Sequence, residues 1–264
     1  MCFPFDAIVP DLPAGFQVMA GGAAGEHHTL TSADGTEFST YLARAEGPTG
    51  VVVLPDVRGL YRFYEQLAER FADAGHPAIA LDYFGRTAGL GPRDEDFEYM
   101  PHVEQTAPET IALDVAAALE FLQAETGVER AITVGFCFGG AQSDLAATNP
   151  DLGLDAVIAF YGTLDPSRHG LAAPNFPAPI EHLDEIRTPL LALFGGADRG
   201  IPPEDVAKLQ DALERNGVPH AIHSYPGAPH SFFDRSFEEH AEASADAWRR
   251  VLDFLGKVGA GTPV

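Results

Sequence analysis

The sequence predicts an α/β fold with a mostly parallel, twisted sheet, helices on both of its faces and an antiparallel strand pair at its N-terminus. From about residue 51 onward, short apolar runs typical of buried strands alternate with segments of helical spacing. This alternation is typical of a parallel sheet. Before it, residues 28–31 and 37–43 alternate in polarity around the turn Ala33-Asp34-Gly35, as in a hairpin. The length of 264 residues and the hydrophobic fraction of 45% suit one such domain.

The elements follow one another without an obvious linker, so residues 27–264 are expected to form a single domain. Residues 1–26 are rich in Gly, Ala and Pro and predict an irregular extension over the surface. The polar stretch 86–109 is either a lid or wall of the active site or a plain surface excursion. Buried strands are expected at residues 51–54, 77–81, 131–135, 156–160, 190–194 and 221–225. Helices are expected at residues 63–74, 110–125, 139–147, 203–216 and about 237–258.

The composition argues against several classes of partner. A net charge of −23 repels nucleic-acid phosphates and anionic membranes, so neither is an expected partner. Residues 1–10 lack the basic region of a signal peptide, and no apolar run approaches the roughly 18–20 residues of a membrane span. The cysteines Cys2 and Cys137 are too few for a disulfide scaffold. These features predict a soluble cytoplasmic protein and leave its oligomeric state open.

The histidines do not form a metal-binding motif. His27 and His28 are adjacent on a predicted strand, but no matching cluster of carboxylates or cysteines accompanies them. We interpret the pair as structural and expect no metal and no other cofactor.

A strand-to-helix turn with a cysteine at its centre predicts the nucleophile. Its sequence is Gly135-Phe136-Cys137-Phe138-Gly139-Gly140, which has the pattern of the nucleophile elbow of the α/β-hydrolase fold, with cysteine where most members have serine. A side chain at Gly135 or Gly139 would clash where strand and helix close up. The N-terminus of the helix favours a thiolate on Cys137, and the N–H of Phe138 is placed to donate to an oxyanion. The alternative is a buried structural cysteine, since cysteine is often buried.

Two further loops at the ends of predicted strands carry candidate partners for this nucleophile. Asp198 stands in a small-residue turn after one predicted strand, and His230 stands in the loop after the next. The order nucleophile, acid, histidine is that of α/β-hydrolases. His230 would take the proton from Cys137, and Asp198 would fix the tautomer of His230. His223 is the alternative base, and Asp198 and His230 could instead be ordinary loop residues.

Together these three loops resemble the dienelactone hydrolase family, over about residues 28–256. The segment Pro55-Asp56-Val57-Arg58-Gly59 after the first buried strand also fits the family. In the family this loop supplies the second oxyanion donor, which the resemblance assigns to the N–H of Val57. Members commonly carry a glutamate there that contacts the nucleophile. Asp56, one methylene shorter, is the candidate for that role, and its alternative is to cap the following segment.

The resemblance implies a hydrolase that cleaves a lactone or carboxylic ester through a Cys-His-Asp triad and an acyl-enzyme intermediate. The family's dienelactone substrates carry a carboxylate that arginines hold, but one of these arginines corresponds to Asp234. The candidates for holding a carboxylate are therefore Arg58, Arg93, Arg199 and Arg235. The alternative is an apolar pocket for neutral esters, with walls formed by Phe136, Phe138, Phe232 and Phe233.

Other functions stay open on the sequence, as does the physiological substrate. A general small-ester or thioester hydrolase, or an acyltransferase, would use the same residues without recognising a carboxylate. A non-catalytic protein that binds small molecules would have no need for three triad residues in this order. A thiol redox protein would need a resolving cysteine near Cys137, and Cys2 is distant in sequence.

Overall fold

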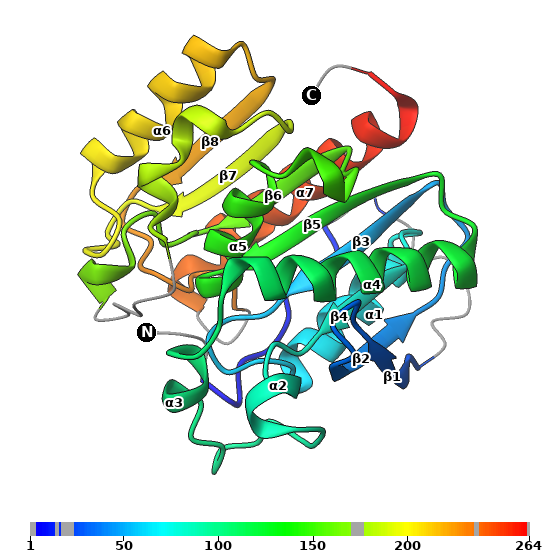
Figure 1. The fold of residues 1–264 in the computed structure, drawn as a ribbon. Coiled ribbons are helices and arrows are strands. Elements are labelled where there is room, and N and C mark those ends of the chain that lie inside the picture. The colour runs from blue at the N-terminus through cyan, green and yellow to red at the C-terminus, as the bar shows by residue number, and fades with distance from the viewer. Residues whose placement is uncertain (1–3, 14–15, 17–23, 170–176, 235–237, 263–264) are drawn as a thin grey trace.

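The computed structural model describes residues 4–13, 16, 24–169, 177–234 and 238–262. In these residues, one sheet of eight strands has helices on both of its faces (Figure 1). The strands lie in the order β1-β2-β4-β3-β5-β6-β7-β8. Their bounds are β1 Glu26–Thr31, β2 Glu37–Ala43, β3 Thr49–Leu54, β4 Ala78–Leu81, β5 Arg130–Phe136, β6 Ala156–Phe160, β7 Leu190–Gly195 and β8 His220–Tyr225.

Strand direction changes only near the N-terminal edge of this sheet. β1 pairs antiparallel with β2, and β2 pairs antiparallel with β4. From β4 to β8, neighbouring strands are parallel. The predicted N-terminal pair and the mostly parallel remainder are therefore confirmed. Because parallel strands end at the same edge, the loops that follow β3, β5, β7 and β8 meet on one side of the molecule.

The helices cover both faces because the buried strands are apolar on both. α4 and α5 lie in front of the sheet, and α1 and α7 lie behind it (Figure 1). In β3, Val51 and Val53 pack in the core cluster that contains α1 and α7, whereas Val52 and Leu54 pack in the cluster that contains α4. The α-helices are α1 Arg62–Asp73, α2 Gly85–Ala88, α3 Met100–Val103, α4 Pro108–Thr126, α5 Phe138–Ala146, α6 Pro203–Asn216 and α7 Ala241–Ala260. The 3-10 helices are η1 Pro150–Leu152, η2 Pro166–His169, η3 Pro179–Glu181, η4 Leu183–Glu185 and η5 Glu238–His240.

Part of the N-terminal extension differs from its sequence-based prediction, because it is buried instead of lying over the surface: Ala7 and Val9 belong to the larger core cluster. The apolar side chains of this extension therefore add to the core. The polar stretch 86–109 contains α2 and α3, and its Arg93 is buried. Within the described ranges, no helix is long and apolar enough to cross a membrane.

Candidate active site

Cys137 lies at a sharp junction between β5 and α5. Its backbone has φ 55° and ψ −111°, a conformation that is strained for a residue with a side chain. A Cβ atom at Gly135 would lie 1.9 Å from the carbonyl oxygen of Gly139, and one at Gly139 would lie 2.0 Å from that of Leu54. Real Cβ atoms do not approach backbone so closely, so the tight turn requires both glycines. Cys137 itself is buried.

Asp198 and His230 come from the turns that follow β7 and β8. The Nδ1 atom of His230 lies 2.5 Å from the Oδ2 atom of Asp198, and both side chains are buried. The other carboxylate oxygen of Asp198 accepts a hydrogen bond of 2.9 Å from the N–H of Gly200. The carboxylate is therefore held from two sides, and it in turn orients the imidazole ring.

The imidazole of His230 also interacts with Cys137. Burial disfavours the charged ring and by itself lowers the pKa of His230. The negative charge of Cys137, hydrogen bonds to Asp198 and Cys137, and the charge of Asp198 outweigh burial and raise this pKa from 6.5 to about 9. The structure thus brings together the three side chains that the sequence singled out. The alternative base, His223, faces away toward α7, where its Nε2 atom lies 3.9 Å from Asp246.

The loop after β3 places Val57 beside the start of α5. A Cβ atom at Gly139 would also lie 2.4 Å from the carbonyl oxygen of Pro55, which shows how closely the two segments approach. Among the described residues, the N–H of Val57 has no hydrogen-bond acceptor. The N–H of Phe138 belongs to the first turn of α5, where amide N–H groups point along the helix axis toward its N-terminus. This arrangement can receive an anionic oxygen.

Asp56 is buried, but its carboxylate is engaged by its own loop. It accepts hydrogen bonds from the guanidinium of Arg58 at 2.8 and 3.1 Å and from the hydroxyl of Tyr61 at 3.2 Å. It also accepts from the N–H of Arg58 at 2.9 Å, a bond within its own turn, whereas the N-cap position of the following helix α1 is Tyr61. Within the described residues, Asp56 has no bond to Cys137, because the guanidinium and phenol draw the shorter side chain into the loop.

The candidate arginines have different surroundings. Arg58 is paired with Asp56, and its guanidinium lies 4.8 Å from the ring centre of Phe5 and 4.4 Å from that of Tyr61. Arg93 is paired with Asp82 at 2.9 Å. Both ion pairs are buried. Arg199 is exposed on the turn after Asp198, and Arg235 lies outside the described residues.

The phenylalanines proposed as pocket walls pack in the core instead. Phe136 is fully buried, and its ring centre lies 4.6 Å from that of Phe160. Phe232 is also fully buried and lies 4.9 Å from Tyr225. Side chains beside a strand end can point to either face, and these two point toward the sheet core rather than toward an open pocket. Phe233 is buried in the same cluster, and Phe138 packs against Tyr83 in the other cluster.

Two tyrosines that sequence reasoning missed also border the site. The ring centre of Tyr161 lies 4.9 Å from that of His230, and Tyr161 has an unusual φ of 37°. The hydroxyl of Tyr83 donates to the carbonyl of Pro55 at 2.9 Å. Burial raises the pKa of Tyr83 well above its usual value, and nearby negative charges, including that of Cys137, add to this effect. Each tyrosine stands just after a strand, a position that could have indicated the same sheet edge.

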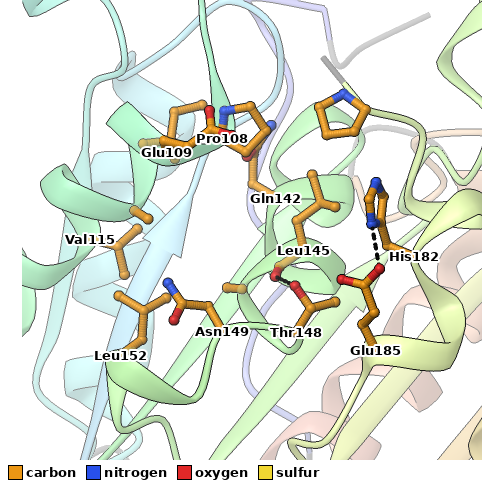
Figure 2. A pocket seen from close by; sticks show the side chains of 14 residues that line it. Pro108, Glu109, Val115, Gln142, Leu145, Thr148, Asn149, Leu152, His182 and Glu185 are labelled. Carbon is orange, nitrogen blue, oxygen red and sulfur yellow. Dashed lines mark hydrogen bonds and ion pairs between the residues drawn. The ribbon is translucent and has the colours of Figure 1, made fainter. Parts of the chain in front are cut away.

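The surface of the described residues has hollows away from the triad. One, of about 230 Å³, lies between α4 and α5, and its lining includes Gln142, Leu145 and His182 (Figure 2). Another, of about 520 Å³, is lined in part by Phe5, Tyr61 and Arg93. Neither lining includes Cys137, Asp198 or His230. The second hollow adjoins the Asp56–Arg58 pair through Tyr61. In the described ranges, no group of three or more His, Cys, Asp or Glu residues could hold a metal ion.

Comparison with known proteins places this geometry in a family. The model of the dienelactone hydrolase family matches residues 38–259. A Synechocystis protein named "Putative carboxymethylenebutenolidase" is 35% identical over 209 residues, which are 76% of this chain and 82% of the relative. An Escherichia coli K12 protein with the same name is 29% identical over 243 residues, 88% of this chain and 86% of the relative. A crystal structure titled as a putative dienelactone hydrolase from Klebsiella pneumoniae superimposes with a TM-score of 0.74 at 25% identity, covering 89% of this chain and all of the other. The chain belongs to the dienelactone hydrolase family.

Proposed function

We propose that this protein hydrolyses a lactone or carboxylic ester through an acyl-enzyme intermediate on Cys137. The observation that carries the proposal is the buried chain of contacts from Cys137 through His230 to Asp198, at the elbow where β5 becomes α5. The names of the relatives, which refer to cleavage of a lactone, support the same reaction class.

The first half of the reaction forms a thioester. The Cys137 thiolate attacks the carbonyl carbon, and the carbonyl electron pair moves to its oxygen, where the N–H groups of Val57 and Phe138 stabilise it. When the intermediate collapses, the C–O bond to the leaving group breaks, and protonated His230 gives its proton to the leaving alkoxide. In a lactone, the alcohol so formed stays attached to the acyl group.

The second half releases the acid. Neutral His230 takes a proton from water as the water oxygen attacks the thioester carbonyl. The tetrahedral intermediate then expels the Cys137 thiolate, which regenerates the thiolate and the protonated histidine. Asp198 keeps Nδ1 of His230 protonated throughout, so that Nε2 is the atom that exchanges the proton.

One observation favours the alternative of a small-ester hydrolase that does not recognise a carboxylate. The guanidinium groups of Arg58 and Arg93 are each neutralised by a buried aspartate of this chain. A substrate carboxylate would have to compete with Asp56 or Asp82 for them. Arg199 and Arg235 stay the candidates for an anionic substrate.

A panel of p-nitrophenyl esters and small lactones tests the function. Wild type is expected to hydrolyse at least one of them, and Cys137→Ala is expected to abolish that turnover while its circular dichroism spectrum stays native. Equal activity of the two proteins on every hydrolysed substrate would overturn the assignment of the nucleophile. Binding of these compounds by wild type without any turnover would support the non-catalytic alternative.

A further inference from the structure

The N-terminal segment Phe5–Val9 lies between two loops of the candidate site that are far apart in sequence. It is anchored by its own packing: Ala7 and Val9 are 8% and 3% exposed, and the N–H of Ala7 donates to the carbonyl of Pro4 at 3.0 Å. The segment is therefore held in one position, and it can restrict the movement of the two loops that it contacts.

Its first contact is with the loop that carries His230. The N–H of Ile8 donates to the Oδ1 atom of Asp234 at 2.9 Å, and Asp234 is 2% exposed. This bond therefore ties the segment to the end of the loop. The loop also needs support because Ser231, next to His230, has a φ of 58°.

Its second contact is with the loop that carries Val57. The ring of Phe5 lies 5.1 Å from that of Tyr61 and covers the guanidinium of Arg58 at 4.8 Å. Arg58 directly follows Val57 and is bonded to Asp56. Phe5 thus closes over the ion pair that holds the shape of the oxyanion loop.

We propose that Phe5–Val9 is a positioning element of the active site, which joins the His230 loop to the Val57 loop and sets the distance between base and oxyanion donor. The proposal rests on the proposed function for its catalytic consequence. None of these residues touches the reacting atoms. Their effect is on geometry, and a misplacement of about 1 Å can lower a rate by roughly a hundredfold.

Substitutions at the two contacts test this role. Asp234→Ala removes the acceptor of the Ile8 bond, whereas Asp234→Asn retains an oxygen at that place. Phe5→Ala removes the ring over Arg58, whereas Phe5→Tyr keeps it. Ile8→Ala is the matched control, because it preserves the N–H that donates to Asp234 and trims a side chain that is 40% exposed.

The measurements are kcat and KM per titrated Cys137, the rate of Cys137 alkylation by iodoacetamide, and Tm. Asp234→Ala and Phe5→Ala are expected to lower kcat by roughly tenfold or more with little change in KM, and to change the alkylation rate. Asp234→Asn and Phe5→Tyr should have a kcat and an alkylation rate close to those of wild type, and Ile8→Ala should behave as wild type. If Asp234→Ala does not fold, the comparison of Phe5→Ala with Phe5→Tyr tests the proposal.

Folded Asp234→Ala and Phe5→Ala could instead show the kcat and the alkylation rate of wild type, with only Tm lowered. That result would overturn the positioning role, because the segment would then contribute to stability alone. The alkylation rate separates this outcome from a failure of the proposed function. If wild type hydrolyses no ester or lactone, an altered alkylation rate in the two variants still supports the positioning of Cys137 and His230, and an unaltered rate contradicts it.

Discussion

The Nδ1 atom of His230 lies 2.5 Å from a carboxylate oxygen of Asp198, although the two residues are separated by 32 positions in the chain. Both stand after neighbouring parallel strands, and the sheet brings the ends of those strands together. This contact fixes which imidazole nitrogen is available to Cys137, and it helps to keep His230 protonated near neutral pH.

Replacing Asp198 by asparagine is expected to change the pH dependence of the reaction. In wild type the pKa of His230 is about 9, so kcat/KM should fall as pH rises through about 9 and the leaving group loses its proton donor. Asp198→Asn removes the negative charge of Asp198 and the hydrogen bond to its carboxylate, which both raise the pKa of His230, and it keeps the burial that lowers this pKa. The alkaline limb of kcat/KM should therefore move to lower pH, and kcat should fall by about 10²–10⁴-fold.

Asp246→Asn is the control for this experiment, because Asp246 lies beside His223. The alkaline limb should stay in place in this variant. A limb that moves in Asp246→Asn and not in Asp198→Asn would identify His223 as the base.

Alanine at Gly139 is expected to destabilise the protein strongly. The added Cβ would meet the backbone of Leu54 at 2.0 Å, and backbone cannot yield as a side chain can. We expect a loss of at least 1–3 kcal/mol in the free energy of unfolding, measured in urea. Gly256 is the matched control: it lies inside α7 with nothing within 4 Å of its added Cβ. Gly256→Ala should stabilise the protein by roughly 0.5–1 kcal/mol, and a similar cost at both positions would contradict the close approach at the elbow.

The four arginines should separate into two groups. Arg58→Ala and Arg93→Ala each remove the charged partner of a buried aspartate, which costs about 3–5 kcal/mol of stability. Because both are engaged inside the protein, the ratio of KM for a carboxylate-bearing lactone to KM for a neutral ester should not change. A rise in this ratio confined to Arg199→Ala or Arg235→Ala would instead identify the residue that holds a substrate carboxylate. A selective rise in Arg58→Ala or Arg93→Ala would contradict the account of their pairing.

Two kinds of feature can be predicted well from the sequence: those that depend on local geometry, and those that arise because parallel strands end at the same edge of the sheet. Gly135 and Gly139 follow from the tight turn around Cys137, and the proximity of Asp198 and His230 follows from their places after successive strands. Their catalytic roles stay predictions.

Features that depend on long-range packing could not be predicted in the same way. The bond between Ile8 and Asp234 joins residues 226 positions apart, and no pattern in either segment indicates it. The pairing of Arg93 with Asp82 likewise depends on how the stretch 86–109 folds back onto the end of β4. Phe136 could have faced either the pocket or the core, since an aromatic residue beside a nucleophile is compatible with both.

The most direct test of the central claim is to trap the acyl-enzyme. Wild type is mixed with a p-nitrophenyl ester that it hydrolyses, quenched in acid during the first turnover, digested and analysed by mass spectrometry. We predict one acyl group on the peptide that contains Cys137, formed at the rate at which p-nitrophenol is released. In Cys137→Ser the acyl group should form far more slowly, because a hydroxyl lacks the reactivity of a thiolate at neutral pH. Full turnover by wild type with no acyl group on Cys137, or with an acyl group on another side chain, would contradict the account.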